Sequence, residues 1–374
     1  MGNWKTCQLG DLITFQRGHD LPKSKMKGGI YPVVGSNGII GYHDEYTTES
    51  PSITIGRSGN VGKPFLYKGR SWSHNTSLYI REYKDIDPIF IYYFLQTLDL
   101  GNYAGGSAVP TLNRNHIHTL TVTVPVDKNE QRQIASVLSV LDDKIEQNTE
   151  INENLAEQAQ GVLYHFMDKQ PYQLQPLSDI AIVIDCLHSK KPSSIEDSIY
   201  QLIQLDNIRD DGFLDMSATR YMISQADYIN WTRKCEIVEG DCVITNVGRI
   251  GAVSQAPYGT KAAMGRNMTC IRLKPGIKLQ AYFITVLLSN HMRRQIQSNT
   301  DEGTIMGALN VKNIPKLLFP IFEPSVMTDL EGVLFPLRKQ IEYNNLQNQT
   351  LAQLRDYLLP KLMSGELDVS ELAL

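Results

Sequence analysis

The sequence predicts an α+β protein: two mixed α/β domains in a pseudo-two-fold arrangement, separated by two long helices that pair as a coiled coil. Three observations predict this fold. The same apolar ladder occurs twice, 196 positions apart. Short strand and turn motifs precede each copy in the same order. A chain of 374 residues is also too long for one ordinary core, so two domains with connecting helices fit its length.

Each ladder steps by four and three residues, which places its rungs on one seam of a long helix. The rungs of the first ladder are Ile134, Leu138, Leu141, Ile145, Asn148, Asn152, Leu155, Ala159, Val162 and Phe166. The rungs of the second are Leu330, Leu334, Leu337, Ile341, Asn344, Asn348, Leu351, Arg355, Leu358 and Leu362. Asparagine at a seam position weakens packing but fixes register and partner. Two unrelated amphipathic helices remain an alternative, although the asparagines interrupt both ladders at the same two rungs.

The ladders set the predicted boundaries. We expect a first domain at residues 1–129, a central helical region at 130–169, a second domain at 170–326 and a C-terminal helical region at 327–374. Asp127 with Glu130, and Thr328 with Glu331, resemble capping boxes that begin the helices. Pro336 falls inside the second ladder, so the helix either kinks or breaks there, which we favour, or begins there. Ser364-Gly-Glu ends this helix by glycine termination.

The segments before the ladders repeat as well. Residues 52–62 are echoed by 241–251, and each is a β-branched run followed by glycines, which indicates a strand that enters a tight turn. Residues 72–80 match 264–272, a pairing that places Asn75 and Asn267 at equivalent positions. Residues 104–113 match 303–310 in the same way. Residues 88–98 and 280–296 are predicted to be helical.

Composition indicates a folded soluble protein, with 42% hydrophobic and 20% charged residues. No apolar run approaches the roughly 18 residues that span a bilayer, and the N-terminal segment lacks the apolar stretch of a signal peptide. We therefore expect a cytoplasmic protein. The five cysteines, at irregular spacing, suit a reducing compartment and form neither a CxxC pair nor a zinc pattern.

The formal charge of −4 does not by itself indicate a nucleic-acid binder, but its distribution is uneven. Residues 1–129 carry 13 Lys/Arg against 10 Asp/Glu, and residues 170–326 carry 16 against 15. The two helical regions carry 7 against 15, so the acidic excess lies on the helices. The weak positive charge of the domains predicts that this chain alone binds DNA poorly.

The motifs of common catalysts are absent. The segment Gly56–Lys63 fails the phosphate-loop spacing, because Arg57 stands where the first glycine is required and Pro64 replaces the Ser or Thr. Asp87-Pro-Ile-Phe90 breaks the Asn/Asp-Pro-Pro-aromatic motif of adenine methyltransferases at its second proline. The histidines show no paired metal spacing, and no GxSxG nucleophile motif occurs. We therefore predict no catalytic residues and no metal site.

The loops are better interpreted as a binding surface. Their polar side chains can donate to phosphates and base edges, with Arg to guanine and Asn to adenine as the favoured pairs. The candidate DNA-binding residues are Arg57, Lys63, His74, Asn75, Arg114, His116, Asn246, Arg249, Arg266, Asn267 and Lys312. For Asn75 and Asn267 a purely structural turn role remains an equal alternative.

Taken in order, these motifs resemble a known family, the specificity (S) subunits of type I restriction-modification systems. The resemblance covers essentially the whole chain and is most specific from Glu130-Gln-Arg-Gln-Ile134 to Asn148 and in Leu358–Leu367. It implies two target-recognition domains that each read one half of a bipartite asymmetric DNA site. It also implies two helical regions that set the spacer and dock two methyltransferase subunits, with no catalysis by the chain itself.

The partners and cofactors follow from the same resemblance. We expect double-stranded DNA, two methyltransferase subunits that bind S-adenosylmethionine, and, through them, restriction subunits that use ATP and Mg. No cofactor is expected on this chain. Two alternatives remain: the recognition subunit of a two-protein nuclease-methylase, and a scaffold of two modules that binds something other than nucleic acid.

Overall fold

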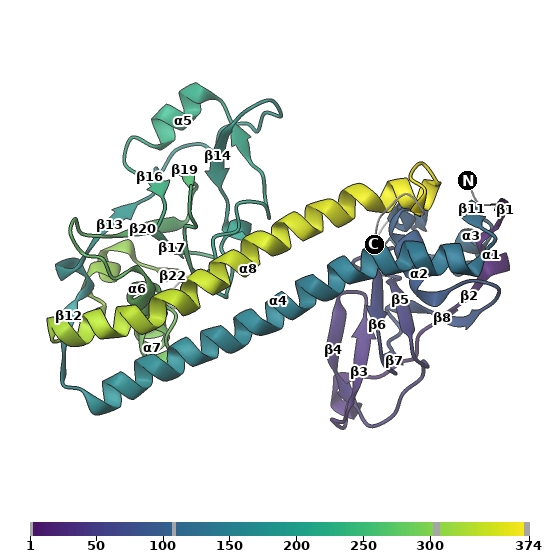
Figure 1. Cartoon of the computed structure of the whole chain (residues 1–374), viewed down its shortest axis with the longest axis horizontal. Coiled ribbons are helices and arrows are strands. Elements are labelled where there is room, and N and C mark those ends of the chain that lie inside the picture. The colour runs from purple at the N-terminus through teal and green to yellow at the C-terminus, as the bar shows by residue number, and fades with distance from the viewer. Residues whose placement is uncertain (1–2, 107–109, 302–306, 370–374) are drawn as a thin grey trace. The chain divides into compact units, whose positions relative to one another are not determined.

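The computed structural model describes residues 3–106, 110–301 and 307–369. The chain divides into two compact units: residues 1–145 with 351–374, and residues 146–350. Both contain strands and short helices, and both include a stretch of each long helix, α4 (Lys128–Lys169) and α8 (Pro324–Ser364) (Figure 1). The mixed α/β class with two long helices, predicted from the sequence, is confirmed.

The first unit is organised around a four-stranded antiparallel sheet in the order β2-β8-β5-β6. These strands are β2 (Ile13–Arg17), β8 (Ser77–Tyr83), β5 (Ser52–Gly56) and β6 (Pro64–Tyr67). A three-stranded sheet joins β4 (Gly38–His43), β3 (Tyr31–Gly35) and β7 (Trp72–Ser73). The strand pairs β1 (Trp4–Gln8) with β11 (Thr121–Pro125), and β9 (Ala104–Gly105) with β10 (Thr111–Leu112), complete its strands in the described residues. All five residues of β5 are buried, because it lies between two partners and its β-branched side chains suit an extended core strand.

The second unit contains a sheet of the same order, β13-β20-β17-β18. Its strands are β13 (Ala181–Asp185), β20 (Met268–Leu273), β17 (Cys242–Thr245) and β18 (Val253–Gln255). A second sheet follows the order β15 (Met222–Ile223), β14 (Tyr200–Ile203), β19 (Lys261–Met264) and β16 (Glu236–Val238). β12 (Tyr172–Pro176) pairs with β23 (Leu318–Phe322), and β21 (Thr300–Asp301) with β22 (Ala308–Leu309). The two units therefore share one strand order around their central sheets.

Short helices cover the sheets. In the first unit they are α1 (Leu9–Leu12), α2 (Pro88–Gln96) and α3 (Arg114–His118), and in the second α5 (Gln225–Trp231), α6 (Gln280–Leu287) and α7 (Asn290–Ser298). Asp87 caps α2 by accepting from the amides of Ile89 and Phe90. The helix predicted at 280–296 is two helices, because Ser289 accepts from the Met292 amide and begins α7.

Each long helix packs into the core of the unit that it enters. In the first unit Ile134 and Leu138 of α4, with Leu359 and Leu362 of α8, join the sheet residues in one hydrophobic cluster. In the second, Ala159 of α4 and the α8 residues around Leu334 do the same. Every ladder residue is buried or half-buried in the unit to which it belongs. No helix in the described residues has the length and apolarity to cross a membrane.

The seam asparagines of the second unit pair with one another. Asn344 donates from Nδ2 to Asn152 Oδ1 at 2.8 Å, and Asn148 donates from Nδ2 to Asn348 Oδ1 at 2.8 Å. Asn148, Asn152 and Asn344 are no more than 5% exposed. Asn148 pairs with Asn348, and Asn152, four residues later on α4, pairs with Asn344, four residues earlier on α8. The two helices therefore run antiparallel within this unit.

In the first unit the polar rung at Arg355 is also satisfied. Its guanidinium Nη1 lies 2.7 Å from Asp142 Oδ1, while the hydroxyl of Tyr93 donates to Asp142 Oδ2 at 2.6 Å. The carboxylate is thereby shared between α8 and α2. Each unit consequently has a polar contact that specifies how its two helix segments meet.

The helix ends differ in part from the prediction. Asp127 accepts from the Asn129 amide at the start of α4, but Glu130 accepts from the Trp4 indole instead of completing a capping box. The capping box predicted at Thr328 is wrong, because α8 begins at Pro324 and the Thr328 hydroxyl donates back to the Pro324 carbonyl.

Glu331 has a different role from the one predicted. Its carboxylate accepts from the backbone amides of Ala281 and Tyr282 at 3.1 and 2.7 Å, and so caps α6, which has no side-chain cap of its own. At Pro336 the helix neither breaks nor begins, since α8 continues through it, and a kink there stays a prediction. A proline ring inside a helix crowds the carbonyl of the residue four positions earlier. For Pro336 that residue is Gly332, and a glycine leaves the backbone there free to adjust. Glycine termination at Gly365 is confirmed by its φ of +73°.

The asparagine pair of the seam gives a stability prediction. We expect Asn344→Leu alone to cost about 1–3 kcal/mol, because the Asn152 amide then stays buried without its partner. The double variant with Asn152→Leu should recover most of that loss. Urea unfolding followed by circular dichroism measures both. Asn154→Leu, at an exposed position of α4, is the control and should change stability little. Additive single effects would contradict the coupling.

Candidate nucleic-acid interface

The turns after β5 and β17 have the same backbone framework. The Arg57 amide donates to the Thr76 carbonyl at 2.8 Å, and the Asn246 amide donates to the Asn267 carbonyl at 2.8 Å. The Arg57 carbonyl accepts from Leu112 at 2.9 Å, as the Asn246 carbonyl does from Leu309. Arg57 and Asn246 are therefore equivalent positions of the repeat.

This hydrogen-bond register corrects one predicted equivalence. Because Asn267 corresponds to Thr76, the position that corresponds to Asn75 is Arg266. Asn267 has a φ of +63°, a left-handed conformation that asparagine tolerates better than most residues, whereas Asn75 does not have positive φ. The turn role left open in the sequence therefore has support at Asn267 only.

Glycines hold both turns in shape. Gly59 and Gly62 have φ of +85° and +81°, and Gly248 and Gly251 have φ of +84° and +78°. A side chain at Gly62 would also lie 2.3 Å from the backbone nitrogen of Gly101. The turn after β5 thus packs directly against the short 3-10 helix at Leu100–Tyr103.

A basic cavity lies beside this turn in the first unit. Its volume is about 480 Å³, and its lining residues are Arg17, Arg57, Leu78, Gly105, Thr111, Leu112, Asn113, Arg114 and His116. No carboxylate is among them. Burial, and to a smaller extent the charge of Arg17, lower the pKa of the Arg57 guanidinium. None of its three arginines forms an ion pair or side-chain hydrogen bond with the described residues, so the cavity presents uncompensated positive charge.

The structure thus brings together three of the predicted residues, Arg57, Arg114 and His116, and adds Arg17. Asn113 begins α3 by accepting from the Asn115 amide, which places Arg114 and His116 on the first turn of that helix. Arg17 was not predicted because it lies on strand β2, outside the turns from which the candidate residues were taken. Arg17 pairs with Leu78 across the sheet, and both residues line the cavity. This pairing positions Arg17 at the site, and a sequence pattern does not reveal it.

The other predicted residues of the first unit lie elsewhere. Lys63 is exposed, with its ammonium 5.8 Å from the centre of the Phe65 ring, and lines a separate cavity of about 570 Å³. His74 is half-buried, Nδ1 lies 3.1 Å from the Thr76 hydroxyl, and burial lowers the pKa of its imidazole. Asn75 donates to the carboxylate of Asp20.

In the second unit the predicted residues differ in availability. Arg266 and Lys312 are exposed, and neither forms an ion pair with the described residues. Arg249 is exposed but donates to the Ile208 carbonyl and to Asp210. Asn246 is only 6% exposed and exchanges hydrogen bonds with the Thr269 hydroxyl, so its side chain supports the fold and does not face a ligand.

One pair of equivalent positions in the two units carries opposite charges. Arg17 pairs with Leu78 across the central sheet of the first unit, and Asp185 pairs with Thr269 at the matching place in the second. Where the first unit has two arginines, Arg17 and Arg57, the second has Asp185 and a buried Asn246. The two units therefore offer chemically different surfaces on the same backbone.

Comparison with known proteins finds similarity to type I specificity subunits. Residues 1–157 match the family model of the type I restriction modification DNA specificity domain. The chain is 24% identical over 316 residues to the type I restriction enzyme MjaIX specificity subunit of Methanocaldococcus jannaschii, covering 76% of this chain and 70% of that protein. It is 27% identical over 154 residues to the type I restriction enzyme EcoprrI specificity subunit of Escherichia coli, covering 40% of this chain and 38% of that protein.

The fold agrees with these matches. The crystal structure of a type I restriction-modification S subunit from M. genitalium superposes with a TM-score of 0.62 at 17% identity, covering 96% of both chains. The N-terminal 157 residues thus match the type I specificity-domain family, and the chain shares the fold of that S subunit. The resemblance to type I specificity subunits predicted from the sequence is confirmed.

The glycine turn gives a second stability prediction. We expect Gly62→Ala to destabilise the protein by roughly 2–4 kcal/mol, from the left-handed φ together with the contact on Gly101. Gly69→Ala is the matched control, because Gly69 has open space around its Cα and no positive φ, and it should change stability by less than about 0.5 kcal/mol. Thermal or urea unfolding compares the two. Equal stability of the two variants would show that the turn adapts freely.

Proposed function

We propose that this chain is the DNA sequence-specificity subunit of a type I restriction-modification complex. Residues 1–129 and 170–326 are its target-recognition domains, and each reads one half of a bipartite, asymmetric DNA site. The observation that carries the proposal is the basic cavity of the first unit, in a domain whose family is defined by DNA specificity.

The chemistry of the cavity fits a DNA strand. Arg17, Arg57 and Arg114 have no carboxylate partners in the part of the chain that the structure describes, so their guanidinium groups are available to phosphate or to the O6 and N7 acceptors of guanine. A cavity lined by one sign of charge also raises the local concentration of an oppositely charged partner. The second unit contributes Arg249, Arg266, Asn267 and Lys312. Because this set differs from the first, the two half-sites differ in sequence.

The long helices set the spacer and dock the methyltransferase subunits. The asparagine pairs favour one register over its neighbours, because a shifted seam would oppose asparagine to an apolar side chain. Large apolar side chains that are exposed on α8 support docking; they are Val333, Phe335, Tyr343, Leu346, Leu354 and Tyr357. Residues 130–169 and 327–374 thus act as the conserved helical regions of the subunit.

The chain itself is non-catalytic and acts in the cytoplasm. S-adenosylmethionine binds to the methyltransferase subunits, and ATP with Mg to the restriction subunits that join through them. The reaction chemistry thereby stays on the partners, and this chain selects the sequence on which they act.

Methylation mapping tests the function. Coexpression of this chain with its methyltransferase partner, followed by sequencing of the methylated bases in the host DNA, should show adenine methylation confined to one bipartite sequence. Deletion of this chain should abolish that methylation while the methyltransferase is still expressed. Unchanged methylation after the deletion would refute the proposal.

The cavity gives a residue-level prediction. We expect Arg57→Ala and Arg114→Ala each to weaken binding of the complex to its site by about 1–3 kcal/mol if they contact base edges, with relaxed specificity in one half-site only. A phosphate contact would instead weaken all sequences alike and reduce the salt dependence. Competition binding with half-site variants at several salt concentrations distinguishes the two. Lys128→Ala, which removes an ion pair with Asp85 at the start of α4, is the control and should leave half-site preference unchanged.

A further inference from the structure

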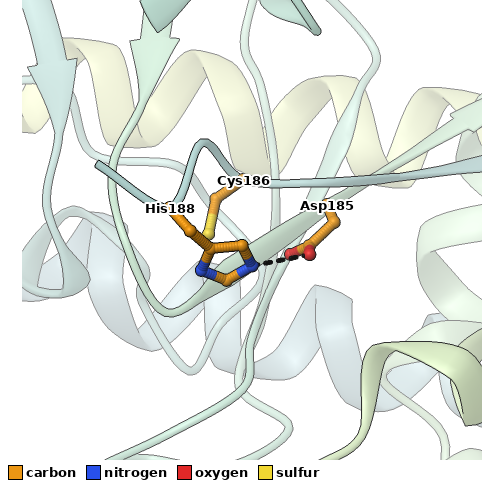
Figure 2. Close-up of side chains that lie close together, drawn as sticks. All are labelled: Asp185, Cys186 and His188. Carbon is orange, nitrogen blue, oxygen red and sulfur yellow. Dashed lines mark hydrogen bonds and ion pairs between the residues drawn. The ribbon is translucent and has the colours of Figure 1, made fainter.

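Three side chains with metal-binding atoms meet at the end of β13, as Figure 2 shows. They are Asp185, Cys186 and His188, and their candidate ligand atoms all lie within 4.8 Å of one another. His188 Nε2 lies 2.8 Å from Asp185 Oδ2. The other carboxylate oxygen, Asp185 Oδ1, is buried and has no hydrogen-bond partner among the described residues beyond the adjacent Cys186 thiol. A buried carboxylate oxygen without a partner is costly, so this site is incompletely satisfied by the protein alone.

The three side chains differ in exposure in a way that suits an ion at the surface. Cys186 is 1% exposed, and the side chains of Asp185 and His188 are 30% and 69% exposed. Burial raises the pKa of the Cys186 thiol, and so do the charge and the hydrogen bond of the neighbouring Asp185 carboxylate, while hydrogen bonds from the backbone of Asn267 and Met268 lower it. The sulfur thus lies at the base of the cluster beside the turn before β20, and the imidazole covers it from the solvent side.

We propose that Asp185, Cys186 and His188 bind a divalent transition-metal ion, with zinc as the best match. Thiolate, imidazole and carboxylate are the ligands that zinc takes in proteins, and three protein ligands leave a fourth position for water. At zinc–ligand distances of roughly 2.0–2.3 Å, tetrahedral ligand atoms lie about 3.3–3.8 Å apart, a separation between the 2.8 Å from His188 Nε2 to Asp185 Oδ2 and the upper limit of 4.8 Å for the cluster. The thiol loses its proton to solvent on binding, and the ion, thiolate and carboxylate together are neutral.

The charge pattern of the repeat gives the site a role. Asp185 occupies the position that Arg17 occupies in the first unit, where the positive charge lines the basic cavity. A bare carboxylate there would repel phosphate from the neighbouring turn that carries Arg266. A bound divalent ion cancels that charge and ties the segment after β13 to this turn. This role rests on the proposed function, whereas metal binding itself does not.

A second cluster of the same residue types serves as the contrast. Cys235, Asp241 and Cys270 are also close together and buried. Asp241, however, already binds the Arg272 guanidinium through both oxygens, at 2.7 and 2.6 Å. A metal ion there would have to displace a well-formed ion pair and lie beside a guanidinium. At the Asp185 cluster Lys234 lies beside the backbone, where its ammonium donates to the Cys186 carbonyl and not to the Asp185 carboxylate.

Metal binding is measured on the full chain without DNA, with its methyltransferase partner if the complex is needed for solubility. After equilibration with Zn²⁺ and removal of unbound ion, elemental analysis should find one zinc per chain. Replacement by Co²⁺ should give the near-ultraviolet charge-transfer band of a thiolate–cobalt bond. Cys186→Ser should remove that band, and His188→Asn, at an exposed position that does not threaten folding, should weaken zinc affinity by about tenfold or more. Cys235→Ser is the control and should keep both zinc and band.

The outcomes separate the hypotheses. Absence of stoichiometric zinc in the unaltered chain, or a thiolate band that survives Cys186→Ser, would overturn the metal site. Loss of zinc in Cys235→Ser but not in Cys186→Ser would place the zinc ion at the cluster of Cys235, Asp241 and Cys270, and would also overturn the proposal. The proposed function fails separately, through methylation that does not depend on the chain. A chain that binds zinc at Cys186 but directs no methylation would keep the site and lose the function.

Discussion

A buried amide in an apolar seam has to find another polar group, and the pairing of the two long helices depends on that requirement. Asn152 and Asn344 satisfy each other where leucine would pack more tightly, so the contact adds specificity at a cost in stability. The Arg355–Asp142 contact has the same consequence in the other unit, with Tyr93 completing the carboxylate. Since a shift of one turn would leave these groups unsatisfied, the helix segments have one preferred alignment in each unit. Each core is then completed by apolar rungs that the polar contacts have already aligned.

The repeat separates what the backbone requires from what the surface can vary. Gly59 and Gly248 adopt almost the same φ, and the amides around Arg57 and Asn246 bond to equivalent carbonyls. These constraints come from turn geometry and admit few residues. The side chains that project from the same framework are under no such limit, and Arg57 in one unit corresponds to a buried asparagine in the other. Divergence of binding chemistry on a preserved turn is therefore possible without loss of either fold.

Sequence patterns predicted those parts of the structure that repeat at short range. The ladder of four and three steps predicted the long helices and the seam asparagines, because helix periodicity is local. Two errors have one cause: Glu331 caps α6 and Glu130 binds Trp4, and both partners lie far away in the sequence. The place of Arg17 in the cavity and the burial of Asn246 could not be predicted from the sequence either. Sheet pairing determines the first, and tertiary packing determines the second. The expectation of a break at Pro336 gave too much weight to the low helix propensity of proline. Leu334 and Ile341 are buried on either side of it, and this tertiary packing keeps the helix continuous.

The like charges of the basic cavity destabilise the free protein, and this indicates what the cavity binds. Burial lowers the pKa of the Arg57 guanidinium, and the charge of Arg17 lowers it further, so the free protein holds two positive charges that repel each other. Ordinary selection for stability would favour a carboxylate among the lining residues, as Asp142 accompanies Arg355 and Asp241 accompanies Arg272. The absence of such a carboxylate among the residues that line the cavity is what a site for an external anion requires. An anion that binds only the folded state would return the lost stability through mass action, and the strand of a nucleic acid supplies phosphates at a spacing that can engage several guanidinium groups together.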